Sequence, residues 1–229
     1  MTRFRELIAA VKKRYPNDGF FAGFEESCRR SVGKRRAYQT YQDALRVLDE
    51  ESWQVLKDKT VRHYRDHRRG QLKQGFFNQL NEAFAYRWLV RQGFSGVRMV
   101  PENNRRTADI EFREDGHRRH CEVKTIGLSD DEINRRQERR YDGARYEQLG
   151  QGLLNQLSDA VRKARAQIGA HNSDGWVYIV LIWDDMALDY YQRHRRTIIA
   201  HCRSKGLDNV YIKVGLRWFR RIRITRRCT

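Results

Sequence analysis

One apolar run constrains the fold of this chain more than any other feature. Residues 176–183 read WVYIVLIW, a stretch rich in β-branched and aromatic side chains. Such a run is typical of a strand covered on both faces, because a half-exposed strand would alternate apolar and polar residues. The run therefore predicts a core strand in the middle of a mixed sheet.

The segments before this strand change from a helical to a strand period. Apolar residues recur every three or four positions over residues 3–69, which indicates helices. Residues 70–93 predict a further helix that ends at Gly93, and its expected buried stripe is Phe77, Leu80, Phe84, Trp88 and Leu89. Short strands are then predicted at residues 97–100, 108–112 and 121–125, with a turn at residues 114–116.

The rest of the chain alternates helix and strand. We expect helices over residues 153–169 and 186–205 and a strand over residues 209–214, whereas residues 129–152 are charged and show no clear apolar stripe. The basic end, residues 217–227, has an alternation at Ile222 and Ile224 that fits an edge strand. The predicted organisation is a helical, basic N-terminal region over residues 1–70 and an α/β domain over residues 71–229.

The charge of the chain indicates a polyanionic partner. The 229 residues include 47 Lys and Arg against 29 Asp and Glu, a formal net charge of +18. Cationic side chains that neutralise phosphates give binding that depends on salt and discriminates little between nucleotide sequences. The four cysteines form no CxxC pair, and no window approaches the roughly 20 apolar residues of a membrane span, so we expect reduced thiols, no membrane partner and a cytoplasmic location.

Three charged residues of the predicted strands can form a site. Alternation places Glu122 and Lys124 on one face of their strand, and pairing with the preceding strand would let Asp109 project beside them while the apolar residues line the core. Carboxylate oxygens with a backbone carbonyl are ligands that Mg²⁺ prefers, and an ammonium nearby can help to hold an attacking water. Glu82 lies at the edge of an apolar helix face, which is costly for a carboxylate unless it is paired or bound to a metal.

These residues resemble the PD-(D/E)XK nuclease superfamily, the restriction-endonuclease-like proteins with an αβββαβ core. The resemblance lies in Asn81-Glu82-Ala83 on the helix, Thr107-Ala108-Asp109-Ile110 on the second strand and Glu122-Val123-Lys124 on the third. It covers roughly residues 71–184, and the residue before Asp109 departs from the family pattern because it is Ala108 and not proline.

The resemblance implies a role for each residue. Asp109, Glu122 and the carbonyl of Val123 would bind Mg²⁺ or Mn²⁺, Lys124 would position or activate the water, and Glu82 would contribute through the metal or a bound water. Gln156 and Lys163 of the following helix would touch the scissile phosphate. Apart from the resemblance, the arginines of the charged insertion could either clamp the nucleic-acid backbone or be ordinary solvated side chains; they are Arg135, Arg136, Arg139 and Arg140.

The leading hypothesis is a Mg²⁺-dependent DNA endonuclease in which a metal-activated water hydrolyses the phosphodiester bond. Two copies of such a site would cut both strands of a duplex, which makes a homodimer one expectation. An alternative is that Glu122 and Lys124 only form ion pairs, and that the chain is a non-catalytic binder of DNA or RNA from a mobile element or defence system. A third is a protein-interaction module that binds nucleic acid weakly.

Overall fold

The structure, a computed structural model, describes residues 2–67, 71–102, 107–128, 130–138, 147–171, 173–183, 188–216 and 221–225. It is an α/β protein whose strands are hydrogen-bonded in the order β1-β2-β3-β4-β5-β6, with parallel and antiparallel pairs. The chain divides into two compact units, Met1–Arg119 and His120–Thr229, and the division falls within β3 (His117–Ile126).

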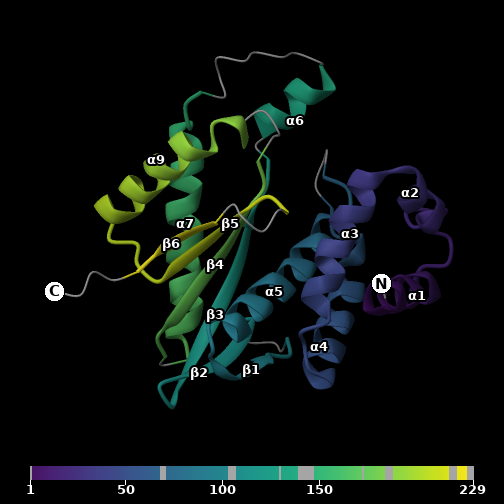
Figure 1. The fold of residues 1–229 in the computed structure, drawn as a ribbon, viewed down its shortest axis with the longest axis horizontal. Helices are drawn as coiled ribbons and strands as arrows, with labels where there is room; N and C mark the ends of the chain where they lie inside the picture. The colour runs from purple at the N-terminus through teal and green to yellow at the C-terminus, as the bar shows by residue number, and fades with distance from the viewer. Residues whose placement is uncertain are drawn as a thin grey trace. The chain divides into compact units, whose positions relative to one another are not determined.

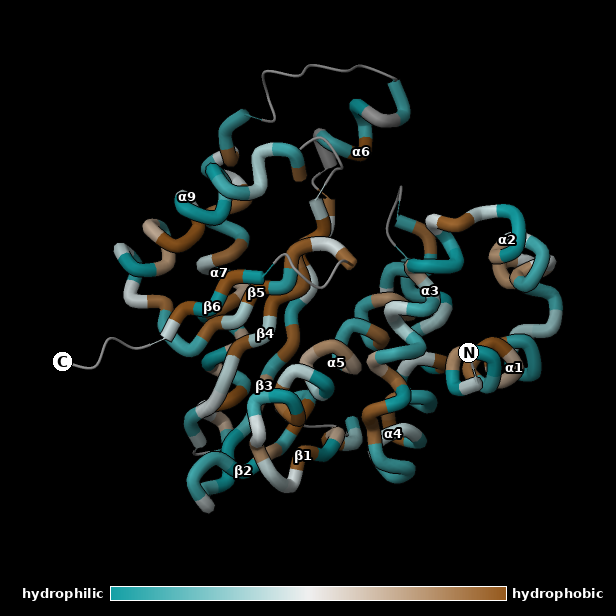
Figure 2. Tube along the Cα trace, viewed as in Figure 1, coloured by the Kyte–Doolittle hydropathy of each residue, from teal (hydrophilic) through white to brown (hydrophobic). Residues whose placement is uncertain are grey.

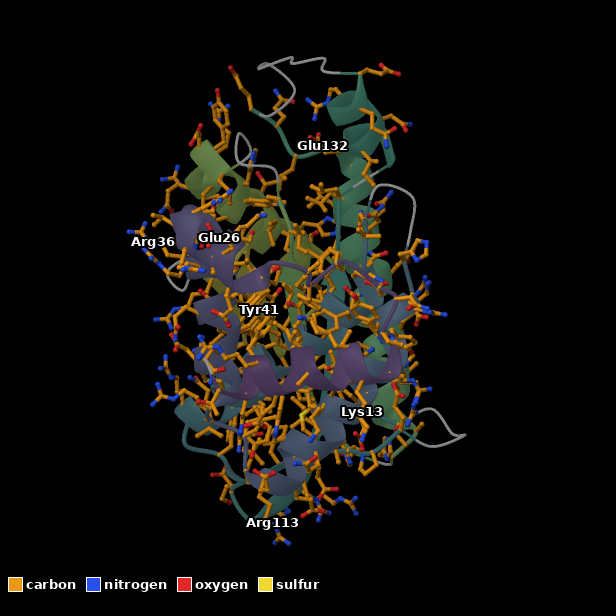
Figure 3. The ribbon with its side chains drawn as sticks, turned by 90° about the vertical axis from the view of Figure 1, so that its right-hand side faces the viewer. Lys13, Glu26, Arg36, Tyr41, Arg113 and Glu132 are labelled. Carbon is orange, nitrogen blue, oxygen red and sulfur yellow. The ribbon has the colours of Figure 1, made fainter. Side chains whose placement is uncertain are left out.

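The first unit consists of helices and the first antiparallel strand pair (Figure 1). Its elements are α1 (Thr2–Arg14), α2 (Phe24–Arg30), α3 (Val32–Leu45), α4 (Glu50–Arg62), the 3₁₀ turn η1 (His63–Arg65), α5 (Gln74–Arg91), β1 (Ser95–Met99) and β2 (Ile110–Glu114). The helical period predicted for residues 3–69 is confirmed in α1, whose buried residues are Phe4, Leu7, Ile8 and Val11. Figure 3 shows Arg36 at the periphery of this unit and Tyr41 among packed side chains.

Helix α5 is the centre of the first unit. It packs against α3 and α4 and also contacts β1 and β2, so every residue from Leu80 to Leu89 is buried. The expected stripe is therefore too narrow. Phe76, which packs edge-on against Tyr64, is fully buried, whereas Phe77 is only half-buried. The predicted end of the helix is confirmed. Gly93 has φ 84°, and its N–H and that of Phe94 close the last turn on Val90 and Leu89.

The turn between β2 and β3 has the predicted chemistry. Asp115 and Gly116 both have positive φ, 51° and 79°, as the two central residues of a tight hairpin turn with the natural strand twist require. A side chain is strained in this region and glycine is not, which explains an Asp-Gly pair between two alternating strands. The hairpin sets where β3 begins and thus where Glu122 and Lys124 lie along it.

The second unit consists of parallel strands, one antiparallel strand and helices. Its elements are the rest of β3, α6 (Asp130–Gln137), α7 (Gln151–Gly169), β4 (Gly175–Leu181), α9 (Tyr191–Ser204), β5 (Val210–Val214) and β6 (Arg221–Ile224). Strands β3, β4 and β5 are parallel, and β6 joins β5 antiparallel, which confirms the predicted edge strand. The core strand is also confirmed, since β4 is buried on both faces.

Helices α7 and α9 cover one face of these strands (Figure 1). Leu157, Val161 and Ala164 of α7 and Ile198 of α9 share a core with alternate residues of β4 and β5, such as Ile179. Figure 2 shows apolar residues along these strands and alternating hydrophilic and hydrophobic turns along α9. Both helices are amphipathic, and the burial of their apolar sides holds them on the sheet.

Several predicted boundaries differ from the structure. The charged insertion contains helix α6, which the sequence did not indicate because Ile133 is its only buried apolar residue among the described ones. The predicted helix over residues 186–205 is described from Tyr191 as α9. Strand β4 ends at Leu181, and Ile182 is 38 % exposed. Among the described cysteines, Cys28, Cys121 and Cys202 are free thiols. None of the described helices combines the length and the apolar character that crossing a membrane requires.

A buried charge cluster joins residues on both sides of Gly70, where the sequence suggested a boundary. The Lys73 ammonium lies 2.5 Å from an Asp18 carboxylate oxygen and 3.8 Å from the centre of the Tyr64 ring. The Tyr64 hydroxyl donates a 2.6 Å hydrogen bond to the same carboxylate. The helices before Gly70 and helix α5 therefore share one core within the first unit, and the two compact units divide at Arg119 instead.

The contacts of Asp18 make one part of the folding stability depend on pH under acidic conditions. Its burial raises the carboxyl pKa, but hydrogen bonds from Lys73, Tyr64 and the Phe20 N–H outweigh burial and lower the pKa to about 2. The unfolded chain therefore takes up this proton first as the pH falls from about 4 to 2, so the contribution is present above that range and lost through it. Over this pH range we expect the unfolding free energy of the wild type to fall by about 2 kcal/mol more than that of Asp18→Asn, as measured by urea unfolding. Asp58→Asn, an exposed control on α4, should follow the wild type, and parallel curves for Asp18→Asn and wild type would contradict this role.

Candidate functional site

Glu82 and Asp109, two of the predicted site residues, meet on one buried ammonium in the first unit. Lys59 of α4 places its Nζ 2.8 and 2.9 Å from the two Glu82 carboxylate oxygens and 3.1 Å from Asp109 Oδ1. The side chains of Lys59, Glu82 and Asp109 are 4 %, 6 % and 16 % exposed. The two carboxylates thus converge on a single cation position, and in this structure an ammonium holds it.

The local sequence explains how these three side chains are positioned. Lys59 lies on the buried stripe of α4, three residues after Leu56, and Glu82 lies in the fully buried part of α5 against which α4 packs. Asp109 immediately precedes β2, and its backbone carbonyl accepts a hydrogen bond from the Val100 N–H at the end of β1. Pairing of the two strands therefore fixes the backbone from which the Asp109 carboxylate projects.

The electrostatics of this trio favour a charged lysine. Burial alone would lower the pKa of Lys59, but the negative charges of Glu82 and Asp109 and their hydrogen bonds outweigh burial and raise the pKa above its usual value. Two buried carboxylates without a cation would be costly, so the ammonium stabilises the arrangement. The expectation that Glu82 is paired is confirmed, since its carboxylate contacts the Lys59 ammonium.

Glu102 and two basic residues lie beside the trio. Glu102 places Oε1 3.9 Å from Lys59 Nζ, and its Oε2 accepts from Arg62 at 2.9 Å and lies 3.3 Å from His63 Nε2. Glu102 is 31 % exposed, unlike the buried Glu82. A third carboxylate therefore lies near the Lys59 ammonium, at 3.9 Å compared with 3.1 Å for Asp109.

Glu122 and Lys124 form the predicted pair in the second unit. The Lys124 ammonium donates to Glu122 Oε1 at 2.5 Å and to Gln167 Oε1 at 2.6 Å, which confirms that both residues of β3 share a face. Glu122 is 2 % exposed, and its neighbour in the β3–β4 register is Val177, a residue of the core under α7. The carboxylate therefore lies on the α7 side of the sheet, and the expectation of an apolar face opposite a polar one fails here because both faces are buried.

Helix α7 contributes Gln167, which the sequence prediction missed. Gln167 lies four residues after Lys163 and eleven after Gln156, spacings that place all three on one flank of the helix. Gln156 and Lys163 are exposed, and Gln167 is half-buried against Lys124. The polar spacing along α7 could have pointed to Gln167, just as a lysine within the apolar period of α4 could have pointed to Lys59.

The arginines of the charged insertion are only partly described. Arg135 is buried and forms an ion pair with Glu132, so its guanidinium is less available to a phosphate than the exposed Lys163. The Arg136 side chain, Arg139 and Arg140 lie outside the described residues. Contact of these arginines with nucleic acid stays a prediction.

The donor chemistry suits a hard divalent cation. In the first unit Glu82 and Asp109 supply carboxylate oxygens, and in the second unit Glu122 supplies a carboxylate and Val123 a backbone carbonyl, each a kind of ligand that Mg²⁺ prefers. Among the described residues, no three His, Cys, Asp or Glu side chains already form a group that could hold a metal ion. Glu82 and Asp109 are two such side chains, and the Lys59 ammonium lies between them.

Comparison of the chain with models of protein families, with curated proteins and with solved structures gives no match.

Removing one carboxylate tests the Lys59 trio. Glu82→Gln leaves the buried ammonium with Asp109 as its near carboxylate, and removing one partner of a buried ion pair typically costs about 3–5 kcal/mol of unfolding free energy. Glu102→Gln is the matched control, because it breaks a partly exposed pair with Arg62 worth less than about 1 kcal/mol. Urea unfolding at pH 7 measures both, and similar losses in the two variants would show that burial of the trio contributes little.

Proposed function

We propose that this chain is a Mg²⁺-dependent DNA endonuclease of the PD-(D/E)XK type. The observation that carries the proposal is the arrangement around Lys124, whose ammonium contacts Glu122 on its own strand and Gln167 on the following helix. The pair belongs to a β3–α7–β4 crossover between parallel strands, as the αβββαβ order of the resemblance requires. The +18 charge of the chain supports a polynucleotide substrate.

The residues that would hold the metal are Asp109, Glu122 and the Val123 carbonyl, with Glu82 contributing directly or through water. When bound, Mg²⁺ supplies charge neutralisation at the scissile phosphate and activation of a water. Lys124 keeps its ammonium beside the Glu122 carboxylate, where it can hold the attacking water in line and stabilise the charge that develops on the phosphate. Gln167 fixes the Lys124 side chain from the helix side, so the ammonium position depends on two contacts.

Helix α7 also offers the substrate two exposed polar groups. Gln156 and Lys163 lie on the same flank as Gln167, so a phosphate backbone that passes along this flank would meet an amide and an ammonium in turn. Neither side chain is buried or ion-paired in the contacts described for it. We therefore assign to them substrate contact and not chemistry, with a homodimer as the form that would cut both strands of a duplex.

A second candidate function has an observation in its favour. Each predicted catalytic carboxylate contacts a lysine, since Glu82 and Asp109 contact Lys59 and Glu122 contacts Lys124. Ion pairs of this kind also occur where carboxylates only stabilise a fold. The chain would then be a non-catalytic binder of DNA or RNA, of use to a mobile element or defence system, with affinity that depends on salt and not on metal.

Cleavage assays separate the two functions. We expect plasmid and oligonucleotide DNA to be cut only with Mg²⁺ or Mn²⁺, and we expect Lys124→Ala and Asp109→Asn each to lower the rate by at least about 100-fold, because each removes a group that acts in the transition state. Lys57→Met is the control that removes one positive charge from α4 outside the trio, and it should cleave at the wild-type rate. Retained cleavage in folded Lys124→Ala and Asp109→Asn would refute the assigned roles, and salt-sensitive binding without cleavage of any DNA or RNA would favour the binder.

A further inference from the structure

We propose that Lys59 is a built-in counter-cation of the Glu82–Asp109 pair, which a divalent metal displaces toward Glu102 when it binds. The starting point is the geometry of the trio, in which one ammonium contacts both Glu82 oxygens and Asp109 at 2.8 to 3.1 Å. These are the oxygens that a hard dication would use, so the ammonium and the metal compete for one position. The inference deepens the proposed function, because it concerns the metal that the nuclease would need.

The burial of the trio explains why a resident cation is needed. Glu82 and Asp109 have side chains 6 % and 16 % exposed, and two such carboxylates facing one position repel each other unless a positive charge lies between them. Lys59 supplies that charge from a neighbouring helix and lets the first unit fold without metal. The same contact lowers the apparent affinity for metal, since the binding-competent arrangement has the ammonium elsewhere.

Glu102 gives the displaced ammonium a destination. Its nearer carboxylate oxygen lies 3.9 Å from Lys59 Nζ, so a rotation of the lysine side chain would form a direct ion pair. Arg62 and His63 contact the other Glu102 oxygen, at 2.9 and 3.3 Å, which leaves the first oxygen directed at Lys59. Lys59 therefore exchanges one carboxylate partner for another and does not lose its charge partner when metal enters.

The experiment measures Mn²⁺ affinity by isothermal titration, without nucleic acid, on the full chain. Lys59→Met should bind Mn²⁺ about tenfold more tightly than Lys57→Met, the control that removes a positive charge from the same helix but outside the trio. Asp109→Asn combined with Lys59→Met should abolish the gain, which locates it at the trio. An affinity of Lys59→Met equal to that of the Lys57 control, or no Mn²⁺ binding by either variant, would overturn the proposal.

A double-mutant cycle tests the role of Glu102. Glu102→Gln should weaken Mn²⁺ binding about threefold when Lys59 is present and should have no effect in the Lys59→Met background, because Glu102 acts only through the lysine. Equal weakening in both backgrounds would make Glu102 a metal ligand and contradict the exchange. Should Lys59→Met fold only with metal, the single variant Glu102→Gln still decides, since unchanged affinity there overturns the proposal.

The outcome is independent of cleavage. Tighter Mn²⁺ binding by Lys59→Met in a protein that cuts no substrate would sustain the counter-cation and refute the nuclease. Metal-dependent cleavage with unchanged Mn²⁺ affinity in Lys59→Met would sustain the nuclease and refute the counter-cation.

Discussion

The requirement that a buried carboxylate has a cation shapes both units of this protein. In the first unit Glu82 and Asp109 meet the Lys59 ammonium, and in the second unit Glu122 meets Lys124. Each lysine comes from an element that packs against or contains its carboxylate, so helix packing and strand alternation position the charges. The stability of the fold and the chemistry proposed for the site therefore depend on the same contacts. A lysine that gives up a carboxylate to a metal must neutralise the buried negative charge of that carboxylate before the metal binds.

The core strand, the edge strand and the end of α5 could be predicted from sequence because local rules determine them. A continuous apolar run gives β4, the Ile222 and Ile224 alternation gives β6, and Gly93 closes α5 through its positive φ. The width of the buried face of α5 could not be predicted in this way. It depends on α3, α4 and two strands packing around one helix, which is a tertiary property.

The acids of the candidate site and Lys124 could be predicted from the sequence, but Lys59 and Gln167 could not. Period-2 geometry found that Glu122 and Lys124 share a face, and a carboxylate within an apolar helix marked Glu82. Lys59 and Gln167 were not predicted because each contacts a residue far away along the chain. Lys59 lies 50 residues from Asp109, and Gln167 lies 43 residues from Lys124. A lysine within the apolar period of a helix is the signal that would have found Lys59, since such a position is tolerated only when an acid lies opposite.

The most direct test of the central claim is a crystal structure of the protein grown with Mn²⁺ and its anomalous difference map. We expect manganese density at the Asp109 carboxylate, with Lys59 Nζ moved from Glu82 to Glu102. Density absent from Asp109, with Lys59 still on Glu82 and Asp109 at saturating Mn²⁺, would make these acids structural partners of a lysine and would contradict the metal-dependent chemistry.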